Sequence, residues 1–123
     1  MSDARGNDPA APAAFIASQW RERLRKAQFE DEASFALGTS AEQLISARAD
    51  RVDDALRAAY AAELANHAGL VLAATGGYGR GELYPQSDID LLLIIEGDDN
   101  ATQIAIERFL AAIWNIGLSV SHI

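Results

Sequence analysis

The chain has 123 residues, a length that suits one small domain with a single hydrophobic core. Its formal net charge of -8 disfavours a surface for nucleic acid, because such surfaces gather Lys and Arg against the phosphate backbone. With no cysteine and two histidines, it has no disulfide framework and too few ligands for a zinc site. Neither a signal-peptide pattern nor an apolar run of membrane-spanning length is present, so we expect a cytoplasmic protein with no membrane partner.

The first 69 residues are expected to form helices behind a disordered start. Residues 1–9 show no apolar periodicity and are predicted to be disordered. Between residues 12 and 37, apolar side chains recur at helical spacing. Ser40, followed three residues later by Gln43, is the pattern of a capping box and predicts the start of a second long helix. Residues 10–69 are therefore expected to be a helical leader.

Near residue 70 the apolar residues change from helical spacing to short continuous runs, and this change predicts an α+β core. Residues 70–75 and 88–96 are short continuous apolar runs, and each is typical of a strand buried on both faces. A third helix is expected over residues 101–116, and a third strand is expected to begin at residue 118. The chain ends inside that strand and would leave unpaired sheet edges. We therefore expect residues 70–123 to be an incomplete core, truncated from a longer protein.

Two aspartates stand at the start of the second predicted strand. Asp88 and Asp90 are one residue apart, so strand alternation places both side chains on one face, about 6.6–7 Å apart along the strand. Carboxylates this close repel each other unless a divalent cation lies between them. Oxygen ligands without sulfur or imidazole favour Mg²⁺ or Mn²⁺ over zinc. The pair predicts a metal site, although Asp-Ile-Asp at a strand start, taken alone, is more often a solvated turn edge.

The loop before the aspartates contains GGYGRG at residues 76–81. Its glycines let a ligand approach the backbone N–H groups, which suits a phosphate chain, and Arg80 adds a forked cation. The spacing differs from the G-x-G-x-x-G dinucleotide fingerprint, and the loop lacks the Lys-Ser/Thr end of a Walker loop. Leu92 and Leu93 stand where an EF-hand requires an oxygen ligand and a glycine. The loop therefore predicts a phosphate site of another kind.

The longer string GGYGRGELYPQSDIDLLL, residues 76–93, resembles the nucleotidyltransferases of the DNA polymerase beta superfamily. More particularly, it resembles the N-terminal transferase domain of the bacterial PII uridylyltransferases, which are bifunctional enzymes. The segment IWNIGLSVSHI, residues 113–123, is similar to the stretch that follows in that family. The resemblance is strong over residues 70–123, whereas the first 69 residues match only in helical character. It implies a nucleotidyltransferase fold with a mixed sheet flanked by helices.

The resemblance also implies a reaction and its site residues. The reaction is transfer of UMP from UTP to a tyrosine hydroxyl of the nitrogen-signalling protein PII, with Mg²⁺ as cofactor and release of pyrophosphate. The implied substrate contacts are Gly76, Gly77, Arg80 and Ser87. The implied catalytic metal ligands are Asp88 and Asp90.

This sequence departs from the family pattern in several places. The superfamily usually has a third carboxylate on a later strand, but residues 118–122 contain no acid. Asn115 and Ser121 stand where the family tends to show Asp and Gly. The family's HD-type phosphohydrolase domain, for UMP removal, and its glutamine-sensing ACT domains have no counterpart here. We therefore expect a fragment that is inactive by itself.

Two other functions stay open. One is a nucleotidyltransferase that uses a different nucleotide or acceptor, because nothing in the motif reads the base. The other is a non-catalytic nucleotide-binding module, which the missing third acid favours.

Among single residues, Ser87 can cap the turn instead of touching phosphate, and a lone Arg80 would most often be a solvated charge. Trp20 and Trp114 are expected in the core.

Overall fold

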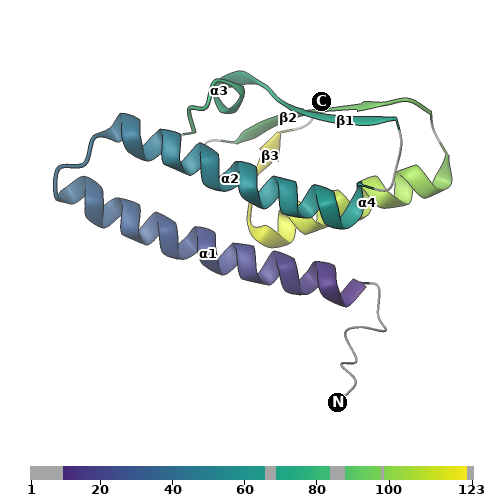
Figure 1. Cartoon of the computed structure of the whole chain (residues 1–123), viewed down its shortest axis with the longest axis horizontal. Coiled ribbons are helices and arrows are strands. Elements are labelled where there is room, and N and C mark those ends of the chain that lie inside the picture. Colours follow the sequence, from purple (N-terminus) through teal and green to yellow (C-terminus); the bar gives the residue numbers. More distant parts are fainter. Residues whose placement is uncertain (1–9, 66–68, 84–87, 98, 122–123) are drawn as a thin grey trace, which may run out of the picture.

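The computed structural model describes residues 10–65, 69–83, 88–97 and 99–121, with the side chains of 10–15 and 121 outside the description. Three long helices lie on one side of a small sheet, and α1 lies farthest from it (Figure 1). In chain order the elements are α1 (Ala10–Ala36), α2 (Ala41–Glu63), β1 (Leu70–Ala74), α3 (Gly76–Gly79), β2 (Ile89–Ile95), α4 (Asn100–Ile116) and β3 (Val120–Ser121). The predicted disorder of residues 1–9 falls outside the described residues.

Side-chain caps fix the starts of α2 and α4. Ser40 has an extended backbone, and its Oγ accepts a hydrogen bond from the Gln43 N–H at 3.2 Å, as the sequence pattern predicts. Asp99 accepts from the Thr102 N–H at 2.7 Å in the same way. These caps satisfy N–H groups that a first helical turn leaves unpaired. Within the described part of the chain, no helix combines the length and apolarity that a membrane span requires.

The sheet has the strand order β1-β2-β3 and is mixed. β1 pairs antiparallel with β2, with Leu72 opposite Leu93 and Ala74 opposite Leu91. β2 pairs parallel with β3, where Asp90 stands opposite Ser121. The α+β fold class is therefore confirmed, with the mixed sheet that the resemblance implies.

The expectation that both strands are buried on two faces is wrong. Side chains of alternate residues in β1 and β2 are about half exposed: Val71 is 55 % exposed, Leu92 49 % and Ile94 52 %. Their neighbours Leu72 and Leu93 pack against the core on the other face. The helices cover only one face of the sheet, so the apolar run continues across a face that is open in this structure.

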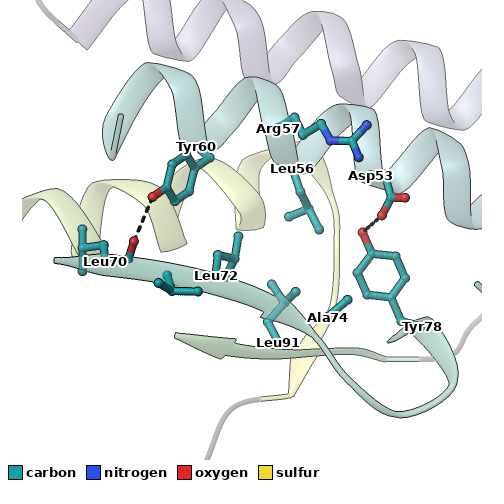
Figure 2. A pocket seen from close by; sticks show the side chains of 10 residues that line it. Asp53, Leu56, Arg57, Tyr60, Leu70, Leu72, Ala74, Tyr78 and Leu91 are labelled. Atoms are coloured by element: carbon teal, nitrogen blue, oxygen red, sulfur yellow. Dashed lines mark hydrogen bonds between the residues drawn. The ribbon is translucent and has the colours of Figure 1, made fainter. Parts of the chain in front are cut away.

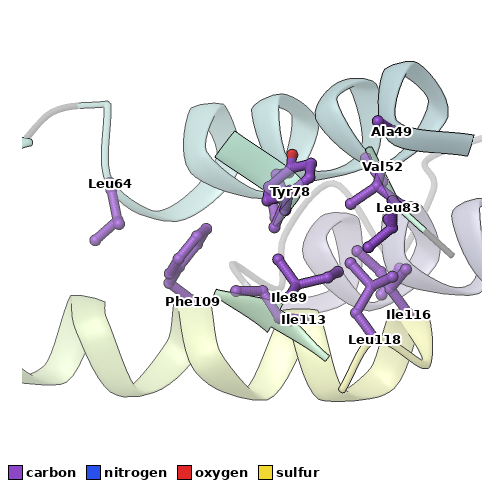
Figure 3. Close-up of a cluster of buried hydrophobic side chains, with 14 of the residues drawn as sticks. Ala49, Val52, Leu64, Tyr78, Leu83, Ile89, Phe109, Ile113, Ile116 and Leu118 are labelled. Carbon is purple, nitrogen blue, oxygen red and sulfur yellow. The ribbon is translucent and has the colours of Figure 1, made fainter. Parts of the chain in front are cut away.

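The core lies between the three long helices and the covered face of the sheet. α1 packs against α2 and α4, and α2 packs against α4, so the predicted leader and the predicted core share one hydrophobic cluster. Figure 3 shows its centre, where the most deeply buried large side chains are Phe109, Leu64, Leu83, Ile89, Ile113 and Val52. The rings of Tyr60 and Phe109 meet edge to face, with centroids 6.3 Å apart.

The two tryptophans differ in their burial. Trp20 is partly buried against the core, as expected. Trp114 is 78 % exposed, so its expected place in the core is wrong. It lies on the side of α4 opposite the buried Phe109, Ile113 and Ile116, which together form the helix face that packs.

Candidate active site

The glycine-rich segment forms a compact turn between β1 and β2. α3 is a single helical turn, closed by the Gly79 N–H donating to the Thr75 carbonyl at 2.8 Å and the Glu82 N–H donating to the Gly77 carbonyl at 3.0 Å. The Thr75 N–H donates to the Asp90 carbonyl at 2.9 Å. This bond extends the β1–β2 pairing and places the turn directly beside the start of β2.

Gly76 and Asp90 are in close contact. Gly76 has φ +61°, a conformation that L side chains rarely adopt. A Cβ added to Gly76 would lie 2.5 Å from the Asp90 Oδ2, and real Cβ atoms do not come this close to another atom unless something shifts. Residue 76 must therefore be glycine if the Asp90 carboxylate is to lie against the turn.

Arg80 lies near the same turn. Its Nη2 is 3.8 Å from the position that a Cβ on Gly77 would take, so the guanidinium folds back toward the first residues of α3. The side chain is exposed. Together with the contact between Gly76 and Asp90, this brings a cation, two glycines and a carboxylate into one group.

Asp88 and Asp90 flank the buried Ile89. Ile89 is 1 % exposed, whereas Asp88 is exposed and Asp90 is partly buried. Because successive strand residues alternate, Asp90 belongs to the face opposite Ile89, together with the half-exposed Leu92, and Asp88 comes directly before the strand. The Asp90 side chain therefore lies on the open face of the sheet, and the exposed Asp88 is its near neighbour along the chain. That both carboxylates share one face stays a prediction.

Two carboxylates supply the hard oxygen donors that Mg²⁺ and Mn²⁺ prefer, so Asp88 and Asp90 are the residues that could hold such an ion. Residues 10–65, 69–83, 88–97 and 99–121 contain no group of three or more His, Cys, Asp or Glu that could hold a metal. Of the predicted substrate contacts, Ser87 lies outside the described residues. Gly76, Gly77 and Arg80 lie together with Asp90, and their roles remain predictions.

A contact that the sequence does not reveal holds the turn to α2. The Tyr78 hydroxyl donates a hydrogen bond to the Asp53 carboxylate, across 25 positions of sequence. Tyr78 is 5 % exposed. Burial, and then the bond to Asp53, raise the pKa of Tyr78 above its ordinary value. The only sign of this contact in the sequence is that Asp53, an acid, stands beside apolar positions of an amphipathic helix.

A cavity of about 430 Å³ lies between α2 and β1 (Figure 2). Leu56, Leu72 and Leu91 form part of its apolar wall, and Asp53 and Tyr78 line it as well. Neither Asp88 nor Asp90 lines it. It opens on the helix side of the sheet, so the predicted site and this cavity lie on opposite faces.

Comparison with known proteins places this geometry in a family context. A nucleotidyltransferase domain model matches residues 60–119, a range that includes the glycine turn and both aspartates. A bifunctional uridylyltransferase/uridylyl-removing enzyme of Pseudomonas syringae pv. tomato is 43 % identical over 105 residues, which are 84 % of this chain and 12 % of that enzyme. An enzyme with the same description from Pseudomonas putida is 44 % identical over 72 % of this chain and 10 % of its own length. Another, from Xanthomonas oryzae pv. oryzae, is 38 % identical over 99 % of this chain and 14 % of its own length.

The chain thus spans between 10 % and 14 % of the length of these three relatives. No solved structure matches it significantly. The family model and the relatives agree with the resemblance carried by residues 76–93, and both include the group formed by Gly76, Arg80 and Asp90. The chain is a homologue of the bifunctional uridylyltransferase/uridylyl-removing enzymes and contains a nucleotidyltransferase domain.

Proposed function

We propose that the chain is the nucleotidyltransferase part of an enzyme that transfers UMP from UTP to a tyrosine hydroxyl of the signalling protein PII. The name of the relatives supports uridylyl transfer, and the resemblance of residues 76–93 supports PII as the acceptor. The observation that carries the proposal is the contact of Gly76 with Asp90, which joins the phosphate-binding turn to a carboxylate on the open face of the sheet. A UTP-consuming enzyme needs a nucleotide pool, so a cytoplasmic location is part of the proposal.

In this reaction the phenolic oxygen of the acceptor attacks the α-phosphorus of UTP and loses its proton. The bond from that phosphorus to the bridging oxygen breaks, and pyrophosphate leaves. The backbone of Gly76 and Gly77 and the Arg80 guanidinium bind and orient the phosphate chain, which reduces the entropy lost on reaching the reactive geometry. Asp88 and Asp90 would hold Mg²⁺, which when bound neutralises phosphoryl oxygens and stabilises the leaving group.

A chimera tests the transfer step. The 105 residues that match the Pseudomonas syringae enzyme replace their counterparts in it, and transfer of label from α-labelled UTP to purified PII is measured. We expect label on PII with the chimera and none with its Asp90→Asn variant. A folded chimera that binds UTP but labels no PII would contradict the proposed transfer. Competition by ATP, CTP and GTP then distinguishes UTP from another nucleotide.

A second candidate function is a nucleotide-binding module without catalysis, because the described site has two acids where the superfamily usually has three. The described residues supply Asp88 and Asp90 but no further acid that could complete a metal cluster. For such a module we expect magnesium-dependent UTP binding without release of pyrophosphate, even in the chimera. Pyrophosphate release in the chimera would exclude it.

A further inference from the structure

The glycine turn is attached to α2 at two points. The Tyr78 hydroxyl donates to the Asp53 carboxylate, and beyond the turn the N–H of the buried Leu83 donates to the Ile45 carbonyl at 3.4 Å. Asp53 and Ile45 both belong to α2. α2 therefore holds the glycine-rich segment at Tyr78, within the turn, and at Leu83, just after it.

The position of Tyr78 within the turn connects it to the predicted phosphate contacts. It lies two residues after Gly76, whose Cα approaches the Asp90 carboxylate, and two residues before Arg80. A Cβ on Gly79 would lie 2.8 Å from the Ala74 carbonyl oxygen, so this part of the turn also has no free space. A shift of Tyr78 must therefore be transmitted to its neighbours.

Packing holds one side of the Tyr78 ring, and the hydrogen bond to Asp53 holds its hydroxyl at the cavity. Tyr78 is almost fully buried, yet it lines the cavity of about 430 Å³ together with Asp53 (Figure 2). The cavity leaves open space beside the ring, so loss of the hydroxyl would let the ring and the turn move. Burial also favours the neutral, hydrogen-bond-donating form of the hydroxyl, in line with the raised pKa of Tyr78.

We propose that Asp53 and Tyr78 are positioning residues that hold the glycine turn against Asp90 and thereby set the affinity of the site for the triphosphate of the nucleotide. This inference rests on the proposed function for its effect on UTP. The other part of the inference, that α2 orders the glycine turn, does not depend on the proposed function.

The test compares two variants that each lose one tyrosine hydroxyl. Tyr78→Phe removes the bond to Asp53. Tyr60→Phe removes a bond from α2 to the Leu70 carbonyl at 3.3 Å and leaves the turn untouched. Both replacements keep the aromatic ring. The dissociation constant of UTP in Mg²⁺ and the rate of amide hydrogen exchange are measured for each variant and for wild type.

We expect Tyr78→Phe to weaken UTP binding by about five- to tenfold, the effect of one lost hydrogen bond, and Tyr60→Phe to change it by less than about twofold. Asp53→Ala should act like Tyr78→Phe. Asp53→Asn keeps an oxygen acceptor for the Tyr78 hydroxyl, so it should restore most of the affinity that Asp53→Ala loses.

Hydrogen exchange separates this inference from the proposed function. The N–H groups of Gly79, Arg80 and Glu82 donate to carbonyls within the turn, so their exchange reports its order whether or not a nucleotide binds. We expect faster exchange at these three amides in Tyr78→Phe and unchanged exchange in Tyr60→Phe. If the wild type binds no UTP, the proposed function fails, and exchange alone decides the positioning role. Equal exchange at these amides in both variants would overturn the inference.

Discussion

At the scale of single residues, Gly76 is the most restrictive position of the candidate site. Gly76→Ala adds a Cβ 2.5 Å from the Asp90 Oδ2 and strains a backbone with φ +61°. We expect a loss of about 1–2 kcal/mol in the free energy of unfolding, from the left-handed backbone. The displaced carboxylate should also weaken magnesium-dependent UTP binding by at least about tenfold. Urea unfolding and titration calorimetry measure the two effects.

Gly81 provides the matched control for this prediction. It has φ +74°, but a Cβ there would have no atom within 4 Å. Gly81→Ala should therefore lose stability through the left-handed backbone alone and leave UTP binding nearly unchanged. Equal losses of UTP affinity in the two variants would mean that the close approach of Gly76 to Asp90 does not contribute to UTP binding.

The Tyr78 hydroxyl predicts how stability depends on pH. Burial raises its pKa most, the hydrogen bond and charge of Asp53 raise it further, and Arg57 opposes them. The unfolded chain releases this proton near the ordinary value of 10.0, whereas the folded chain holds it to higher pH. Above that value the unfolded state binds fewer protons, so the stability from this group is complete below pH 10 and decreases as the pH rises toward the folded pKa.

Tyr78→Phe should make the decrease in the free energy of unfolding above pH 10 less steep. Urea unfolding at about pH 8.5 and about pH 11 measures it, with Tyr60→Phe as the control for the loss of a hydroxyl. The same slope in Tyr78→Phe and wild type would show that Tyr78 does not cause the decrease.

At the scale of elements, α4 has one buried and one exposed side. Phe109 is 1 % exposed and meets Tyr60 of α2, whereas Trp114 is 78 % exposed on the same helix. Phe109→Ala should cost about 3–5 kcal/mol in the free energy of unfolding, because it leaves a cavity in the core. Trp114→Ala should change it by no more than about 0.5 kcal/mol. A costly Trp114→Ala in denaturant unfolding would mean that another surface covers α4.

The starts of the helices could be predicted from the sequence because capping is local. Ser40 and Gln43 are three residues apart, and their bond forms as expected. The glycine turn and the alternation around Ile89 are local for the same reason. Relations over long separations could not be predicted: the link from Asp53 to Tyr78 depends on how α2 packs beside β1.

The strands show a different limit of sequence patterns. A continuous apolar run such as residues 91–95 predicts burial on both faces, yet the helices cover only one. Leu92 and Ile94 share the open face with Asp90 because all three have the same strand parity. Periodicity could not reveal which face is covered, since both faces have apolar residues.

At the scale of the whole molecule, the packed helical layer and the candidate site lie on opposite sides of the sheet. The three long helices lie on one side of the sheet (Figure 1), and the cavity opens on that side. Asp90 belongs to the other face, beside the turn at the end of β1. The buried Ile89 between the two acids anchors β2 in the core. A rigid strand on a packed layer is the kind of support that holds ligands at fixed positions.

The net charge of -8 is consistent with this arrangement. An acidic surface repels a free nucleotide, whose charge is also negative, unless the site supplies cations locally. Arg80 provides one at the turn, and a divalent ion held by Asp88 and Asp90 would provide another. Binding of the nucleotide should therefore depend strongly on magnesium.

The most direct measurement is the dissociation constant of UTP with and without Mg²⁺, for wild type, Asp90→Asn and Asp54→Asn. Asp54 is the matched control, because it loses the same charge from an exposed position on α2, 3.8 Å from Arg57. We predict that Mg²⁺ tightens binding by at least about tenfold in wild type and Asp54→Asn, and has little effect in Asp90→Asn. Magnesium-independent binding in wild type, or an unchanged magnesium effect in Asp90→Asn, would contradict the assignment of the turn and the aspartates as a metal-dependent nucleotide site.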